Sequence, residues 1–154
     1  MKISVIGSQG QVGSELVSAG LARGWDIQAL DHSEVDVTDP QSLKTVLSPF
    51  APNYVINTAA FHNVGECEKQ PEIANNVNAI GAKNVAEIAS ELSAVAVYFS
   101  TDYVFDGNIE FGKAYVAEDP TNPLNAYGFS KREGEKATLE ASPSNLVIRI
   151  SVSY

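Results

Sequence analysis

The chain of 154 residues is 44% hydrophobic and 19% charged, which suits one domain with a substantial core. Its formal net charge of −9 argues against nucleic-acid binding, which needs a basic surface. No apolar run approaches the roughly 18 residues of a membrane span, and the opening Met1-Lys2-Ile3 reads as a strand rather than a signal peptide. The single cysteine, Cys67, rules out an internal disulfide and fits a reducing cytoplasm. We therefore expect a cytoplasmic protein with no metal, nucleic-acid or membrane partner.

The first residues predict a nucleotide-binding turn. A buried strand at residues 2–6 runs into Gly7, Gly10 and Gly13, and a helix follows. In such a turn the first glycine permits the tight bend, the second lets the backbone approach a pyrophosphate, and the third lets helix and strand pack closely. The positive end of the helix then meets the phosphates. Asp31, 18 residues after Gly13 and at the end of a second apolar run, suits a ribose hydroxyl.

Strands and helices alternate along the first half of the chain. Apolar residues at helical spacing after the glycine turn predict a helix that Gly24 ends. Two more strands follow, and the short helix between them begins after Asp39-Pro40 and is broken by Pro49 and Pro52. In order, we predict a helix at 11–23, a strand at 26–30, a helix at 41–47 and a strand at 54–57.

The second half continues this alternation. We predict a polar loop at 61–71, a long helix at 72–93, a strand at 94–100, a loop at 102–123, a helix at 126–140 and a strand at 145–150. Such a pattern is typical of an α/β, Rossmann-type doubly wound parallel sheet with helices on both faces. We therefore expect residues 1–154 to form one dinucleotide-binding domain, with its ligand at the carboxyl ends of the strands.

Three side chains near that edge predict proton transfer. Tyr127 and Lys131 lie four residues apart on a predicted helix and share a face. An ammonium about 4 Å from the phenol would lower its pKa by at most about three units, which would bring it near neutrality. Thr101 follows the fourth strand and can hydrogen-bond both a substrate oxygen and the phenol. Each is a weak signal alone, because most such residues are surface side chains or caps; the combination after a dinucleotide turn indicates a catalytic site.

Four motifs then occur in order: Gly7-Ser-Gln-Gly-Gln-Val-Gly13, Asn57-Thr-Ala-Ala60, Ser100-Thr-Asp-Tyr-Val-Phe-Asp-Gly107 and Pro123-Leu-Asn-Ala-Tyr-Gly-Phe-Ser-Lys131. With them the whole chain resembles the extended short-chain dehydrogenase/reductase family, and within it the dTDP-4-dehydrorhamnose reductases. The third and fourth motifs are the most specific. The resemblance implies NAD(P)H-dependent reduction of the 4-keto group of a dTDP-4-keto-6-deoxy sugar.

The resemblance also implies roles for individual residues. Tyr127 would protonate the keto oxygen, Lys131 would hold the nicotinamide ribose and Thr101 would orient the carbonyl. His62 and Asp102 are candidates near the substrate, and Asn78 either supports the site or packs its helix. The residues expected to bind the cofactor, besides Tyr127 and Lys131, are Gly7, Gln9, Gly10, Gln11, Val12 and Gly13 at the pyrophosphate, Asp31 at the ribose, Asp36 and Val37 at the adenine, and Ala59 and Ala60 at its middle.

Cofactor choice follows from charge. The Asp31 carboxylate repels a 2′-phosphate and accepts from a 2′-hydroxyl, so NADH is slightly favoured over NADPH. The subfamily as a group takes either cofactor. One departure from the family pattern is Gly65, which stands where an aspartate is common.

Other readings remain open. A sugar-nucleotide epimerase or dehydratase shares the fold, but Asp102-Tyr103 lacks the second carboxyl group that a dehydratase uses. A non-catalytic NAD(P)-binding or regulatory subunit is the main alternative. Family members run to nearly twice this length, with a carboxyl-terminal substrate lobe. We therefore expect a cofactor-binding half that alone does not reduce a sugar nucleotide at a useful rate, and whose fifth strand is an edge that pairs with a second copy or a partner chain.

Overall fold

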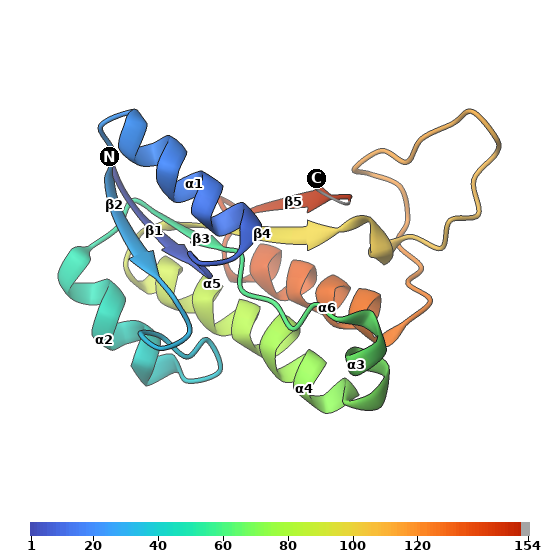
Figure 1. Cartoon of the computed structure of the whole chain (residues 1–154), viewed down its shortest axis with the longest axis horizontal. Helices are drawn as coiled ribbons and strands as arrows, with labels where there is room; N and C mark the ends of the chain where they lie inside the picture. Colours follow the sequence, from blue (N-terminus) through green and yellow to red (C-terminus); the bar gives the residue numbers. More distant parts are fainter. Residues whose placement is uncertain (152–154) are drawn as a thin grey trace.

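A computed structural model describes residues 1–151; residues 152–154, the last three of the predicted domain, lie outside this part. Five parallel strands form one sheet in the order β2-β1-β3-β4-β5 (Figure 1). The strands are β1 (Lys2–Ile6), β2 (Asp26–Leu30), β3 (Tyr54–Asn57), β4 (Val95–Thr101) and β5 (Leu146–Ile150). After β2 the chain crosses to β3 on the other side of β1, so the strand order reverses at β1. Within the described residues β5 is an edge strand, as predicted.

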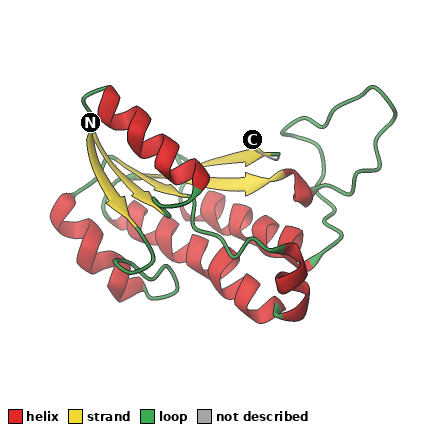
Figure 2. Ribbon diagram, viewed as in Figure 1, coloured by secondary structure: helices red, strands yellow, loops and turns green. Residues whose placement is uncertain are grey.

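Helices cover both faces of the sheet. Helix α1 (Gln11–Ala22) lies over one face, and α2 (Pro40–Phe50), α5 (Gly81–Glu91) and α6 (Ala126–Ala141) lie over the other (Figure 2). This arrangement confirms the predicted Rossmann-type doubly wound sheet. In the described residues no helix is long and apolar enough to cross a membrane.

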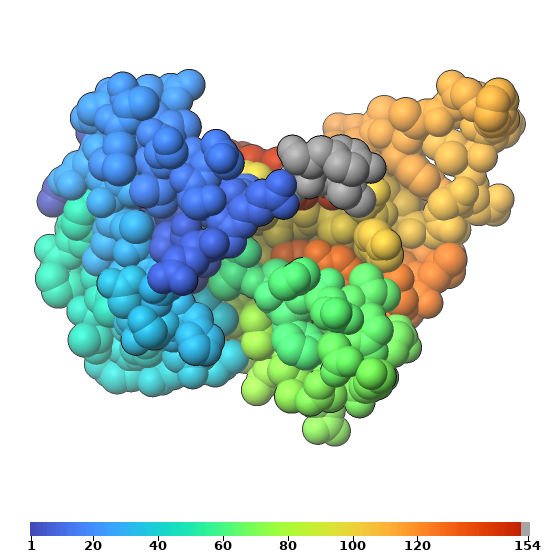
Figure 3. Space-filling view, viewed as in Figure 1, coloured from blue at the N-terminus to red at the C-terminus, as the bar shows by residue number. Residues whose placement is uncertain are grey.

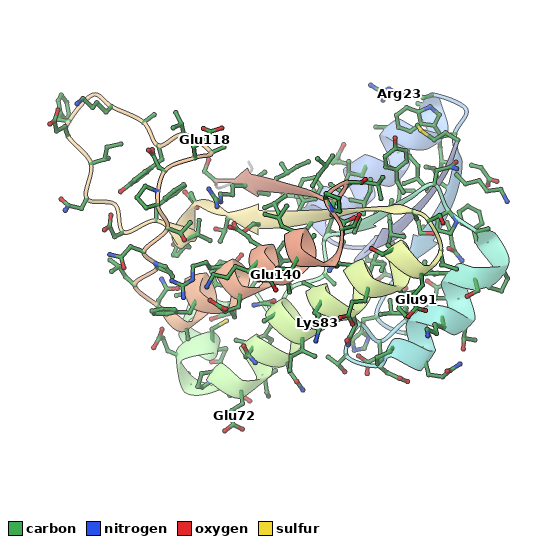
Figure 4. The ribbon with its side chains drawn as sticks, turned by 180° about the vertical axis from the view of Figure 1, so that it is seen from behind. Arg23, Glu72, Lys83, Glu91, Glu118 and Glu140 are labelled. Carbon is green, nitrogen blue, oxygen red and sulfur yellow. The ribbon has the colours of Figure 1, made fainter. Side chains whose placement is uncertain are left out.

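The main core lies between the sheet and α2 and α5. Leu43 and Leu47 of α2 have no exposed surface, and they pack with Val55 of β3 and with Val85 and Ile88 of α5. Full burial of each such side chain is worth about 1.5–3 kcal/mol. Outside this core the helices carry charge: Lys83 and Glu91 of α5 and Glu140 of α6 point away from the sheet (Figure 4).

The prediction that Pro49 breaks the second helix is wrong. Helix α2 runs to Phe50 with Pro49 in its last turn, and it ends where Ala51 adopts a left-handed φ of 51°. A proline inside a helix removes one N–H donor and crowds the preceding turn, and here only Phe50 follows it in the helix. The buried leucines hold the helix through that turn.

The segment between β3 and β4 is more helical than predicted. The expected loop at 61–71 contains α3 (Val64–Lys69), which the Asn63 side chain caps by accepting from the N–H of Glu66 at 3.0 Å. The long helix predicted at 72–93 is present as a helical run of α4 (Pro71–Asn75), a π-helical turn, η1 (Asn76–Ile80), and α5. A π turn inside a helix is often found at a functional site.

A long loop leaves the sheet after β4. It begins with a short 3-10 helix, η2 (Asp102–Val104), and continues to the start of α6. Its outer part extends away from the body of the molecule (Figure 1), and at its base the rings of Phe105 and Tyr115 stack with centroids 4.2 Å apart.

Candidate functional site

The glycine turn joins β1 to α1 by close backbone contact. Gly7 has a φ of +82°, and a Cβ on it would lie 2.7 Å from Thr58 Oγ1. A Cβ on Gly13 would lie 2.2 Å from the Gly7 carbonyl oxygen, a distance that two such atoms cannot adopt. Gly10 is the N-cap of α1 and brings no side chain to its first turn. The turn therefore presents backbone, at the positive end of a helix, to the space beside it.

A cleft of about 980 Å³ opens beside this turn, at the carboxyl ends of β1, β2 and β3. Cofactor sites typically measure about 300–1,000 Å³. In Figure 3 the surface is hollowed between the blue amino-terminal residues and the green residues near 60–75. The lining includes these predicted residues: Gly7, Gln9, Gly10, Gln11, Val12, Gly13, Asp31, Asp36, Val37, Ala59, Ala60 and His62.

Two carboxylates line the far end of the cleft. Asp31 Oδ1 accepts from the backbone N–H and the hydroxyl of Ser33, at 2.7 and 2.6 Å, and Gln9 Nε2 donates to Oδ2. The bonds from Ser33 lower the pKa of Asp31, so it stays ionised. Asp36 accepts from the N–H and hydroxyl of Thr38, at 2.8 and 2.7 Å, which lowers its pKa in the same way. Both anions are thus fixed by their own turns.

Thr101 and Tyr127 meet at the end of β4. Thr101 caps η2 by accepting from the N–H of Tyr103 at 3.1 Å, and the Tyr103 ring meets the Tyr127 ring edge-on at 5.7 Å. Burial raises the pKa of the Tyr127 phenol, and a side-chain hydrogen bond with Thr101 lowers it in part. At neutral pH the phenol therefore keeps its proton.

Lys131 lies one turn further along α6, but its ammonium points to the sheet. Nζ donates to the Phe99 carbonyl oxygen at 2.6 Å and lies 4.1 Å from the centre of the Tyr98 ring. The residue is only 2% exposed, and burial lowers its pKa to about 7. The expected lowering of the pKa of Tyr127 by this ammonium is not found, because the shared helix face directs the lysine toward β4 rather than toward the phenol.

Asn78, in the π turn, joins the cleft to α6. Its Oδ1 accepts from the Phe61 N–H at 2.8 Å, and its Nδ2 donates to the Phe61 carbonyl and to Ser130 Oγ, both at 2.9 Å. Its own carbonyl accepts from the Tyr98 hydroxyl at 2.8 Å. Of the two expected roles, support of the site fits these contacts better than helix packing alone.

The other candidates lie near the same edge. His62 is exposed at the cleft, and Asp102 Oδ1 accepts from Thr101 Oγ1 at 3.2 Å. A Cβ on Gly65 would meet only Asn63 Oδ1, at 3.5 Å, so nothing near the backbone blocks a side chain at this position. The glycine therefore differs from the common aspartate in lacking a carboxylate, and not because space is short. Cys67 is buried. Within residues 1–151 no group of three His, Cys, Asp or Glu side chains is placed to hold a metal ion.

Three residues near the lysine were not predicted: Tyr98, Glu135 and Arg149. Glu135 follows Lys131 by four residues, so helical spacing was a signal for it. Arg149 approaches from β5, and no local pattern places it there.

Comparisons with known proteins agree with this geometry. The family model for the RmlD substrate binding domain matches residues 1–154. The dTDP-4-dehydrorhamnose reductase of Aggregatibacter actinomycetemcomitans is 36% identical over 154 residues, which cover 99% of this chain and 52% of that protein. Among solved structures, the dTDP-4-dehydrorhamnose reductase of Clostridium acetobutylicum has a TM-score of 0.92 at 36% identity, covering 97% of this chain and 52% of that one.

A second solved relative is the dTDP-4-dehydrorhamnose reductase of Bacillus anthracis in complex with NADP. Its TM-score is 0.94 at 33% identity, covering 99% of this chain and 54% of that one. The chain therefore spans about half the length of the relatives that it matches.

Proposed function

The chain belongs to the RmlD substrate binding domain family, and from this premise we propose that it is the cofactor-binding half of an NAD(P)H-dependent sugar-nucleotide reductase. The substrate class is a dTDP-4-keto-6-deoxy sugar, and the product carries a hydroxyl at C4. The bound dinucleotide supplies the hydride. The proposed domain is residues 1–154, and the proposed location is the cytoplasm.

The observation that carries this proposal is the Thr101–Tyr127 hydrogen bond beside the glycine cleft. Thr101 orients the substrate carbonyl oxygen, and Tyr127 holds the proton that this oxygen receives. Because burial raises the pKa of Tyr127, the phenol is protonated before the reaction begins. Lys131, once it reaches the ribose of the cofactor, keeps the dinucleotide in register with the phenol.

The glycine turn holds the pyrophosphate by backbone contact, because Gly7 and Gly13 exclude side chains from it. Asp31 accepts from a ribose hydroxyl at the far end of the cleft. Its ionised carboxylate repels a 2′-phosphate, so we propose a slight preference for NADH. The relative from Bacillus anthracis was solved in complex with NADP, which supports NAD(P) as the cofactor class.

The second candidate is a non-catalytic NAD(P)-binding or regulatory subunit. It is favoured by the position of Lys131, whose ammonium donates to the Phe99 carbonyl oxygen rather than reaching the phenol of Tyr127. The epimerase or dehydratase reading ranks lower, because Tyr103 stands where a dehydratase carries its second carboxyl group. Both alternatives keep the cleft, so only turnover separates them from the reductase.

The test is conversion of a dTDP-4-keto-6-deoxy sugar with NADH or NADPH, followed by mass spectrometry of the sugar nucleotide. Reduction adds two hydrogens, one as hydride and one as the proton from Tyr127. We expect slow conversion by these 154 residues tested alone, because positioning of the substrate can supply about 7–11 kcal/mol of a barrier and these residues match only about half of each relative. Light scattering of the same sample tests association through the β5 edge. Cofactor binding without any reduced sugar, at any protein concentration, would favour the regulatory subunit.

A further inference from the structure

An ion pair with a buried carboxylate lies one helical turn beyond Lys131. Glu135, on the same face of α6, is only 4% exposed. Arg149 of β5 holds it through two bonds, from Nε to Oε1 at 2.8 Å and from Nη2 to Oε2 at 2.7 Å. Such a bidentate pair fixes the carboxylate in position.

Arg149 is itself fixed by the long loop after β4. Its Nη1 donates to the Ala117 carbonyl oxygen at 2.9 Å, and its guanidinium carbon lies 5.1 Å from the centre of the Phe105 ring. The loop returns past the end of β5 beside these contacts, near Glu118 (Figure 4). Loop, strand and helix thus meet at one carboxylate below the lysine.

The lysine needs such a partner. Burial disfavours its charged form, and its direct contacts are a carbonyl oxygen and the face of a Tyr98 ring, which are neutral. An amine without its proton has no charge for the dinucleotide and donates less well to ribose oxygens. Glu135 is the negative charge that favours the ammonium.

We propose that the Glu135–Arg149 pair is the positioning partner of Lys131, and that its carboxylate keeps the lysine in the ammonium form that holds an NAD(P)H ribose. The inference deepens the proposed function, on which it rests for the identity of the ligand. Glu135 acts through Lys131 and does not touch substrate or cofactor. The titratable and charged groups around the lysine and its neighbour Tyr127 are Tyr98 from β4, Tyr127 and Glu135 from α6, Arg149 from β5, Cys67 from α3, and Asp102 and Tyr103 from η2.

The test is the titration of Lys131 in the free protein. Lysine side chains labelled with ¹³C report protonation through the shift of their ε-methylene groups, and Lys131→Met assigns the signal. In the wild type we expect a midpoint near pH 7. In Glu135→Gln, which keeps the shape and removes the charge, we expect the midpoint to fall by roughly one pH unit or more.

Glu133→Gln is the matched control. Glu133 lies on the same helix but pairs at the surface with Arg132 and Lys136, so its loss should leave the Lys131 midpoint unchanged. In Glu135→Asp, which keeps the charge, the Lys131 midpoint should lie closer to the wild-type value than it does in Glu135→Gln. An unchanged midpoint in folded Glu135→Gln would overturn the proposal.

A second variant covers the case in which Glu135→Gln fails to fold. The double change Glu135→Gln with Arg149→Met removes both charges and leaves no unpaired ion in the interior. The Lys131 midpoint should fall in this variant too, and a wild-type midpoint would again contradict the proposal.

Binding of NADPH separates this inference from the proposed function. In the wild type the affinity should fall as pH rises above 7, and in Glu135→Gln the fall should begin at lower pH. If wild-type protein binds no NADPH or NADH, the proposed function fails, while the lysine titration still decides the role of Glu135.

Discussion

The ammonium nitrogen of Lys131 lies 2.6 Å from the carbonyl oxygen of Phe99, inside the protein. The helix that carries Tyr127, the proposed proton donor, therefore also buries a cation against the sheet. Burial of this kind costs stability, and the fold retains it at the edge where the cleft opens. The cost and the proposed role of the lysine can be measured separately.

Lys131→Met should stabilise the free protein near neutral pH. The folded pKa of about 7 lies below the ordinary lysine value of 10.5, so the unfolded chain binds more protons between these values. Stability of the wild type therefore rises with pH across this window, and the cost is fully present below pH 7. The shift corresponds to at most about 5 kcal/mol. Urea unfolding at pH 6.5 and pH 10 should show a gain in the variant that shrinks at the higher pH.

Lys136→Met is the control for this measurement. Its side chain is 54% exposed on the same helix, so its effect on unfolding should be small and should not change with pH. A Lys131→Met variant that is less stable than wild type at pH 6.5 would show that the contacts of the lysine outweigh its desolvation.

Gly13→Ala should disrupt the turn. Its Cβ would lie 2.2 Å from the Gly7 carbonyl oxygen, so α1 must shift away from β1. We expect a loss of stability of about 1–3 kcal/mol and weaker NADH binding, measured by urea unfolding and calorimetric titration. Gly65→Ala is the control, because its new Cβ meets only a side-chain oxygen at 3.5 Å. Alanine favours a helix over glycine, so this variant should unfold at the same urea concentration as wild type or at a higher one.

Asp31→Ala should narrow or reverse a preference for NADH over NADPH. In the proposed complex the carboxylate accepts a hydrogen bond from a ribose hydroxyl, and a hydrogen bond to a charged group is worth about 1.5–3 kcal/mol. The same carboxylate repels a 2′-phosphate. The measurement is the ratio of the two dissociation constants. Asp26→Ala, at the amino end of the same strand, should leave the ratio unchanged. An identical ratio in all three proteins would mean that Asp31 serves only its own turn.

Tyr127→Phe should lower any reduction of the sugar nucleotide with little effect on cofactor affinity. Loss of a general acid typically costs a hundred- to ten-thousandfold in rate. Tyr54→Phe removes a phenol at the amino end of β3, away from the cleft, and should react like wild type. Conversion by Tyr127→Phe at the wild-type rate would reject the phenol as proton donor.

The strands were predicted from sequence to within a residue at each end. Buried parallel strands are short apolar runs bounded by turn residues, and Tyr54–Asn57, which follows Pro52 and Asn53, has both features. The glycine turn was predictable because a side chain at any of its three glycines would lie too close to a neighbouring atom, so the turn needs the glycine pattern that the sequence shows. Helix α3 was missed although Asn63 and Glu66 have the spacing of a cap and its third residue. Short polar helices carry little periodicity, so the loop composition dominated that prediction.

The orientation of Lys131 could not be predicted. Helical spacing puts Lys131 and Tyr127 on one face, but the direction of a long side chain depends on what lies opposite, here Phe99 and Tyr98. The pair of Glu135 with Arg149 joins residues 14 apart on a helix and a strand. Such a contact depends on where the pairing of β4 with β5 places Arg149 relative to α6, and sequence alone does not give that pairing.

Calorimetric titration of this chain with NADH and with NADPH tests the central claim most directly, because the cleft beside the glycine turn is present in these residues. We predict saturable binding of one dinucleotide per chain. Binding should be lost in Gly10→Val, in which the side chain holds a pyrophosphate away from the start of α1, and circular dichroism should show that this variant is folded. Failure of the wild type to bind either dinucleotide, or equal affinity in wild type and folded Gly10→Val, would contradict the assignment of the cleft as a cofactor site.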